Sequence, residues 1–176
     1  VRGPDIKKDE LIEKVRNCIK DIGYDQEGFT WREPTKIESY LHSQSPDIAM
    51  GVDSLGNKDE GAGDQGIMFG YACSETESFM PAPIFYAHKI LEELSSYRKN
   101  NESFFLPDSK SQVSMFYENG VPKQVESLVV STQHHKTASN IEIREKVIEI
   151  IEKAIPTNIF CLLYTSDAAD EPMRVE

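Results

Sequence analysis

The sequence predicts an α+β protein in which helices pack on one face of a mostly antiparallel sheet. Three observations predict this class. Apolar residues recur at helical spacing in three segments, other segments alternate apolar with polar residues as strands do, and an Asn-Gly pair separates two strand-like runs. From residue 67 onward, the predicted order is strand, helix, strand, strand, helix.

The composition limits the classes of partner. The chain has 176 residues and a net charge of −11. Its hydrophobic content of 39% is ordinary for a folded globular domain. The acidic balance argues against nucleic acid or an anionic membrane surface as the main partner, because both bind clustered Lys and Arg. No apolar run reaches transmembrane length. The cysteines, Cys18, Cys73 and Cys161, show no metal or disulfide spacing, which indicates a reducing, cytoplasmic compartment.

The N-terminal third predicts a helix, a strand and a long loop. Residues 9–22 have apolar side chains on one stripe, and Gly23 is suited to end that helix. Residues 36–42 alternate apolar with polar side chains, which predicts a short strand with one buried face. Residues 44–60 are polar, acidic and glycine-bearing, and are either a lid or binding loop or an unstructured linker.

A glycine-rich segment precedes the next strand and helix. Four glycines within residues 61–72 surround Asp64 and Gln65, so the segment is either a binding loop or a plain turn. Residues 67–73 then predict a strand, and prolines near residue 82 open a helix. The predicted buried stripe of this helix is Ile84, Ala87, Leu91 and Leu94. His88 lies beside that stripe, and without a spaced partner it is better explained by packing than by catalysis.

The remaining elements are a hairpin and a last helix. Residues 112–117 and 125–134 predict two strands joined by a turn at Asn119-Gly120, the strongest hairpin signal in the chain. Residues 141–154 predict a helix, with Ser139 or Asn140 as its N-cap. Its predicted buried face is Ile143, Val147, Ile150, Ile151 and Ala154.

Three polar clusters could support chemistry. The first is Asp64 with Gln65. In the second, residues 108–110, an Asp and a Lys two apart on a strand share a face, where Lys can neutralise a phosphate and Asp can accept from a ribose or an amine. The simpler interpretation is that Asp108 and Lys110 form a surface ion pair without a ligand. The third is residues 133–135, whose adjacent histidines point to opposite faces of a strand and do not form a metal site.

Several motifs, in sequence order, resemble the S-adenosylmethionine synthetase (methionine adenosyltransferase) family. The resemblance covers about residues 5 to 158 and is specific because the motifs are long and keep their order. The motifs are residues 44–49 (Gln-Ser-Pro-Asp-Ile-Ala), 61–72, 80–83 with 86–88, 107–113 (Pro-Asp-Ser-Lys-Ser-Gln-Val) and 131–134 (Ser-Thr-Gln-His).

The resemblance implies a reaction. Enzymes of this family join ATP and L-methionine: the methionine sulfur attacks the ribose C5′ and expels tripolyphosphate, which is cleaved to phosphate and diphosphate. The resemblance also implies Mg²⁺ and K⁺ as cofactors. It further implies subunits of three similar, pseudo-symmetric α+β domains, paired as homodimers or dimers of dimers with active sites at the interface.

The resemblance also assigns residue roles. Gln44 would contact methionine. Asp64 would be catalytic and hold the substrate at its ribose or methionine end. Asp108, Ser109 and Lys110 would bind ATP, with Lys110 on the phosphates and also catalytic. The implied gating-loop residues are Gln44, Ser45, Pro46, Asp47, Ile48, Gly51 and Asp53. Many family members have Arg at the position of Leu106, so the resemblance assigns no cationic contact there.

The resemblance divides the chain into four segments. Residues 1–43 would be the end of the N-terminal domain, 44–60 the gating loop, 61–160 the central domain, and 161–176 a non-native tail that looks like a translated sequencing adapter. The family's His-Pro-Asp-Lys motif and its C-terminal lysine motifs are not among the 176 residues. We therefore expect the metal ligands outside this chain and the chain alone to be inactive. The alternative is a non-catalytic nucleotide-binding or dimerisation fragment.

Overall fold

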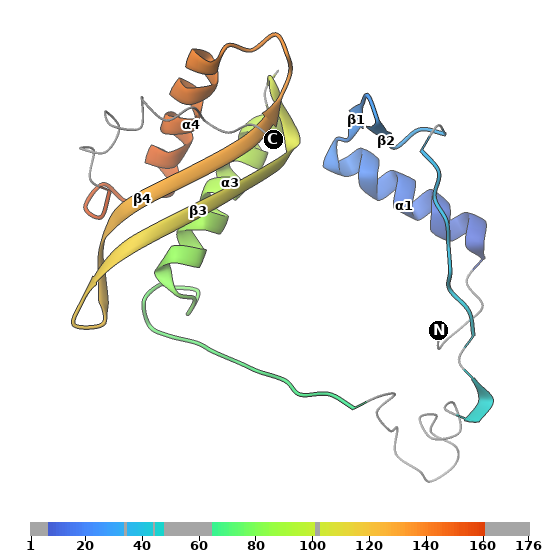
Figure 1. Ribbon diagram of the computed structural model, residues 1–176, viewed down its shortest axis with the longest axis horizontal. Helices are drawn as coiled ribbons and strands as arrows, with labels where there is room; N and C mark the ends of the chain where they lie inside the picture. The colour runs from blue at the N-terminus through green and yellow to red at the C-terminus, as the bar shows by residue number, and fades with distance from the viewer. Residues whose placement is uncertain (1–6, 34, 44, 48–64, 101–102, 161–176) are drawn as a thin grey trace. The chain divides into compact units, whose positions relative to one another are not determined.

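The structure, a computed structural model, describes residues 7–33, 35–43, 45–47, 65–100 and 103–160 (Figure 1). The chain divides into two compact units, residues 1–70 and 71–176, and each unit is described by itself. The predicted boundaries at residues 44, 61 and 161 fall at positions outside the described ranges, so they stay predictions. No helix in the described part of the chain is long and apolar enough to cross a membrane.

The first unit is built around helix α1 (Lys8–Ile22). Gly23 ends the helix as predicted, with φ of 103° and its N–H donating to the carbonyl of Ile19 at 3.1 Å. A short hairpin follows, formed by β1 (Asp25–Gln26) and β2 (Phe29–Thr30). The guanidinium of Arg16 joins the helix to the segment after the hairpin, because it donates to the carbonyls of Trp31, Arg32 and Thr35.

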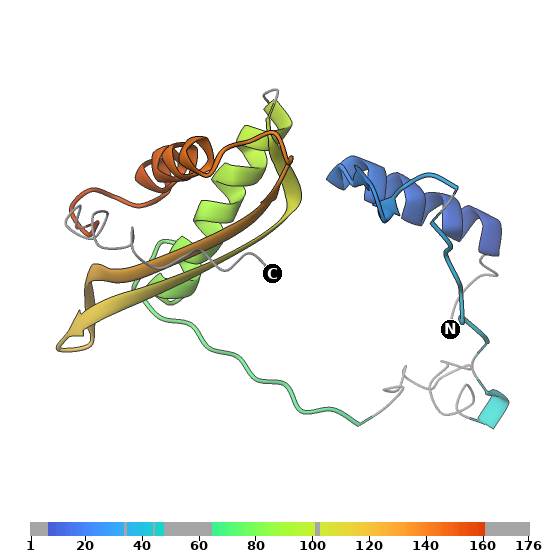
Figure 2. The same ribbon diagram turned by 45° about the horizontal axis from the view of Figure 1, so that its top comes forward.

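The second unit has the element order α3 (Ala82–Asn100), β3 (Phe105–Glu118), β4 (Val121–His134) and α4 (Asn140–Ala154). The two strands are 14 residues long and antiparallel. Asn119 and Gly120 have φ of 52° and 76°, as the turn of a two-residue hairpin requires. Both helices lie on one face of this hairpin (Figures 1 and 2), which confirms the α+β class.

The core lies between the hairpin and the two helices. One buried cluster joins Ile90 of α3, Val113 and Val125 of the strands, and Ile151 beside the end of α4. A second cluster joins Leu94, Phe105, Ile143 and Ile150. Ser139 rather than Asn140 is the N-cap of α4: its hydroxyl accepts from the Glu142 N–H at 3.3 Å, and the Glu142 carboxylate accepts from the Ser139 N–H at 2.9 Å.

Two predicted strands are wrong. Residues 36–42 and 67–73 are all described, and none of them belongs to a strand. Residues 67–71 are exposed, with Phe69 at 93%. The described sheet of the second unit is therefore the β3–β4 hairpin alone, and the predicted strand before α3 is missing from the order. An alternating apolar and polar pattern is compatible with a β-strand. A strand forms only where a neighbouring strand supplies the backbone hydrogen bonds.

The buried stripe of α3 also differs from the prediction. Ile84 is 40% exposed, whereas Ile90, which was not predicted to be buried, is 0% exposed. Ala87 and Leu94 are buried as predicted, and Leu91 is half-buried. The stripe is rotated because α3 faces the hairpin and α4 together, and periodicity alone does not say which of two adjacent stripes faces them.

Candidate functional site

The candidate site lies on the open face of β3, the face opposite to helices α3 and α4 (Figures 1 and 2). Asp108 and Lys110 are exposed, whereas Ser109 between them is half-buried. The helix side of the strand is identified by Ser111, whose hydroxyl donates to the carbonyl of Ala87 at 2.6 Å. Since side chains alternate along a strand, Asp108 and Lys110 project from the opposite, open face.

The structure brings together two of the three predicted ATP-binding residues. Asp108 and Lys110 share a face, as predicted. They lie within β3, because the strand begins seven residues earlier than the predicted start at residue 112. Ser109 belongs to the helix side, so its side chain points away from the other two. In the described part of the chain, no ion pair or side-chain hydrogen bond involves Asp108 or Lys110, which leaves both charged groups available to a ligand.

The open face continues onto β4. Ser131 is the register partner of Lys110, and Ser109 pairs with Thr132 on the other face. The next pair along the ladder is Phe105 with His134, so the register shifts in between. Ser131 was not predicted as a site residue on its own. Counted back from the Asn119-Gly120 turn, Lys110 would pair with Val129, but two irregularities between Ser114 and Tyr117 shift the register by two residues. No pairing signal in the sequence therefore pointed to Ser131.

The other predicted site residues belong to the first unit or lie outside the described residues. Ser45, Pro46 and Asp47 are exposed and belong to the first unit. Gln65 is also exposed and belongs to that unit. The remaining predicted positions lie outside the described residues: Gln44, Ile48, Gly51, Asp53 and Asp64.

The histidines do not form a metal centre in the described residues. The Nδ1 of His134 lies 3.1 Å from the carbonyl oxygen of its neighbour His135. Among the described residues, no group of three or more His, Cys, Asp or Glu side chains could hold a metal ion. His88 is exposed on α3, where it lines a shallow depression with Glu92.

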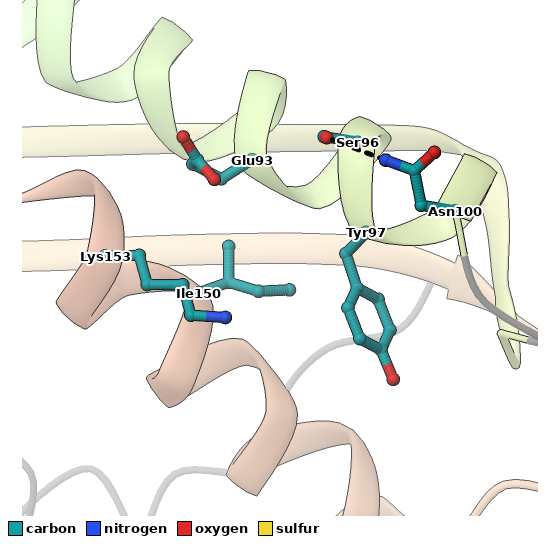
Figure 3. A pocket seen from close by; sticks show the side chains of 6 residues that line it. All are labelled: Glu93, Ser96, Tyr97, Asn100, Ile150 and Lys153. Atoms are coloured by element: carbon teal, nitrogen blue, oxygen red, sulfur yellow. Dashed lines mark hydrogen bonds between the residues drawn. The ribbon is translucent and has the colours of Figure 1, made fainter.

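A separate pocket of about 180 Å³ lies between α3 and α4 (Figure 3). Its lining residues are Glu93, Ser96, Tyr97, Asn100, Ile150 and Lys153. The amide of Asn100 donates to the hydroxyl of Ser96 at 3.3 Å, and the carboxylate of Glu93 lies 3.8 Å from the ammonium of Lys89. None of the predicted site residues lines it, and its position in the helix layer separates it from the open strand face.

The chain is similar to proteins of known family. A sequence model described as S-adenosylmethionine synthetase, central domain, matches residues 59–170. This range includes the first residues of the segment 161–176, so the origin of that segment stays a prediction. The S-adenosylmethionine synthase of Pelagibacter ubique is 61% identical over 157 residues, which are 89% of this chain and 40% of that protein. The enzyme of Parvibaculum lavamentivorans is 53% identical over 91% of this chain and 41% of its own length.

A solved structure agrees with these relatives. An S-adenosylmethionine synthetase from Campylobacter jejuni, described as unusual, superposes with a TM-score of 0.73 at 28% identity, covering 91% of this chain and 42% of that one. The chain thus spans about 40% of the length of the curated relatives that it matches. Fold, motifs and relatives agree, and the chain belongs to the S-adenosylmethionine synthetase family.

Proposed function

We propose that this chain supplies the ATP-binding part of a cytoplasmic methionine adenosyltransferase. The parent enzyme forms S-adenosylmethionine from ATP and L-methionine and cleaves the tripolyphosphate to phosphate and diphosphate. Family membership supports the reaction. The observation that carries the proposal for this chain is the position of Asp108 and Lys110, two opposite charges on one open strand face that have no partner among the described residues.

Lys110 contributes through charge. When the sulfur attacks C5′, negative charge develops on the departing polyphosphate, and a cation held beside it stabilises the transition state more than the ground state. The ammonium of Lys110 is a compact donor that suits this task. Asp108 lies two residues before Lys110 on the same face of β3. Its carboxylate accepts hydrogen bonds from a ribose hydroxyl or an amine of the nucleotide.

The second substrate and the cofactors belong to the parent enzyme. Gln44 would contact methionine, the gating loop would close over it, and Asp64 would hold the ribose or methionine end. Mg²⁺ and K⁺ are the proposed cofactors, which neutralise phosphate charge when bound. The described residues do not form a metal ligand set, so we assign no step to a metal here. The parent is a homodimer or a dimer of such dimers.

The chain alone is a nucleotide-binding fragment without turnover. The family's phosphate-binding histidine motif and C-terminal lysine motifs are not among its 176 residues. Incubation of the chain with ATP, L-methionine, Mg²⁺ and K⁺, followed by mass spectrometry of the products, should therefore yield no S-adenosylmethionine. Product above the enzyme-free control would contradict this.

A chimera tests the role of this domain in catalysis. Residues 61–160 of this chain would replace the corresponding segment of the Pelagibacter ubique relative, which is 61% identical over its match to this chain. The chimera should be active, and Lys110→Ala should lower its kcat by roughly 100-fold, as the loss of one preorganised charge stabiliser does. The matched control is Lys123→Ala, in the same hairpin but ion-paired to Glu118 at 3.7 Å. Equal activity of the two variants would refute the role of Lys110.

A further inference from the structure

The open face of the hairpin has a second half, formed by β4. Residues directly opposite each other in an antiparallel pair lie on the same face, with Cβ atoms about 5 Å apart. Ser131 stands in this relation to Lys110. Ser127, four residues earlier on β4, stands in the same relation to Ser114 and so lies farther along the same face. The Ser131 side chain therefore starts beside that of Lys110, the residue assigned to the phosphates.

Gln133 lies on this face as well, because it is two residues beyond Ser131. Its surroundings are irregular. The pairs on either side of it are Phe105 with His134 and Ser109 with Thr132, so the single residue Gln133 opposes residues 106–108, which include Asp108. Extra residues of this kind bend a strand and re-aim side chains, and they are frequent beside active sites.

The side chain of Gln133 has an unpaired acceptor. Its Oε1 is buried and has no hydrogen-bond partner in the described part of the chain. A buried acceptor without a donor destabilises a protein, so such atoms are normally paired, either within the protein or with a bound molecule. Here the unpaired oxygen belongs to the residue opposite Asp108, at the point where the register shifts.

We infer that Ser131 and Gln133 are binding residues of the nucleotide site, so that both strands contact the ligand. The Ser131 hydroxyl donates to a phosphate oxygen that Lys110 neutralises. The Gln133 Oε1, which is buried in this structure, must first turn out toward Asp108, and it then accepts from a hydroxyl or amino group of the nucleoside. This inference rests on the proposed function, because it takes the phosphates to lie at Lys110.

The first test is chemical footprinting of the 176-residue chain. Limiting acetic anhydride acylates exposed lysines, and mass spectrometry measures the rate at Lys110 as inorganic tripolyphosphate is added. Tripolyphosphate should slow acylation of Lys110 and not of Lys123. Ser131→Ala should raise the midpoint concentration for protection about tenfold, the effect of losing one hydrogen bond to a charged group. The control Ser127→Ala, the same change on the same face, should leave the midpoint unchanged.

The second test separates Gln133 from the phosphates. Gln133→Leu should raise the midpoint for protection by ATP and leave that for tripolyphosphate unchanged, because tripolyphosphate lacks the nucleoside's hydroxyl and amino donors. Thermal unfolding of each variant checks that the hairpin is intact. Midpoints equal to wild type in Ser131→Ala and Gln133→Leu would overturn the inference and leave the proposed function standing. Absence of any protection of wild-type Lys110 would overturn the proposed function itself, and the inference with it.

Discussion

Truncation of Ile90 should be among the most destabilising single changes in the second unit. Ile90 is 0% exposed and packs in the cluster that joins α3 to the hairpin and to the end of α4. Ile90→Ala removes about three methylene equivalents at roughly 0.8 kcal/mol each and leaves a cavity, so we expect a loss of about 3 kcal/mol in the free energy of unfolding. For a domain of this size that lowers Tm by roughly 12–24 °C.

The assay is thermal and urea unfolding of the chain followed by circular dichroism. Ile90→Val should cost only about 1 kcal/mol and remains measurable if the alanine variant does not fold. Ile84→Ala is the matched control, because it makes the same change one stripe away at a residue that is 40% exposed. Its effect should be within about 0.5 kcal/mol of wild type. A larger loss in Ile84→Ala than in Ile90→Ala would refute the packing of α3 described above.

Two further predictions concern local contacts. Ser139→Ala removes the cap of α4 and should lower the free energy of unfolding, measured with urea, by about 1 kcal/mol. Ser139→Asp should retain most of the stability, because Asp is also a good N-cap. A Ser139→Ala variant as stable as wild type would contradict the capping role. Partial desolvation of Tyr117, which is 36% exposed, and then the hydrogen bond from its hydroxyl to the Glu75 carboxylate at 2.7 Å raise the pKa of Tyr117 from 10.0 to about 12. The neutral phenol thus stabilises the folded state below about pH 10, and this contribution is lost as pH rises toward 12. Spectroscopic titration should show one tyrosine ionising near pH 12 that is absent in Tyr117→Phe, and an unaltered titration curve would exclude the shift.

The candidate site was only partly predictable from the sequence. Asp108 and Lys110 could be placed on one face because two-residue alternation is a local property of any strand. The position of Ser131 beside Lys110 could not be predicted from alternation. The two residues are 21 positions apart, and only the register of the hairpin brings them together. The same register shows Gln133 opposite an irregular stretch of β3, which no local pattern indicates.

The sequence by itself determined helices α1, α3 and α4, the hairpin turn and the family. Helices form their hydrogen bonds within one segment, so local periodicity was enough to predict α1, α3 and α4. Short local signals also predicted the end of α1 at Gly23 and the turn at Asn119-Gly120. Tertiary structure alone decided which alternating segments become strands and which stripe of α3 is buried. Residues 36–42 and 67–73 have the pattern of strands but no partner in the described structure, and Ile90 is buried because α3 packs on a surface assembled from three other elements. Both outcomes depend on contacts between distant parts of the chain, and local sequence patterns do not encode them.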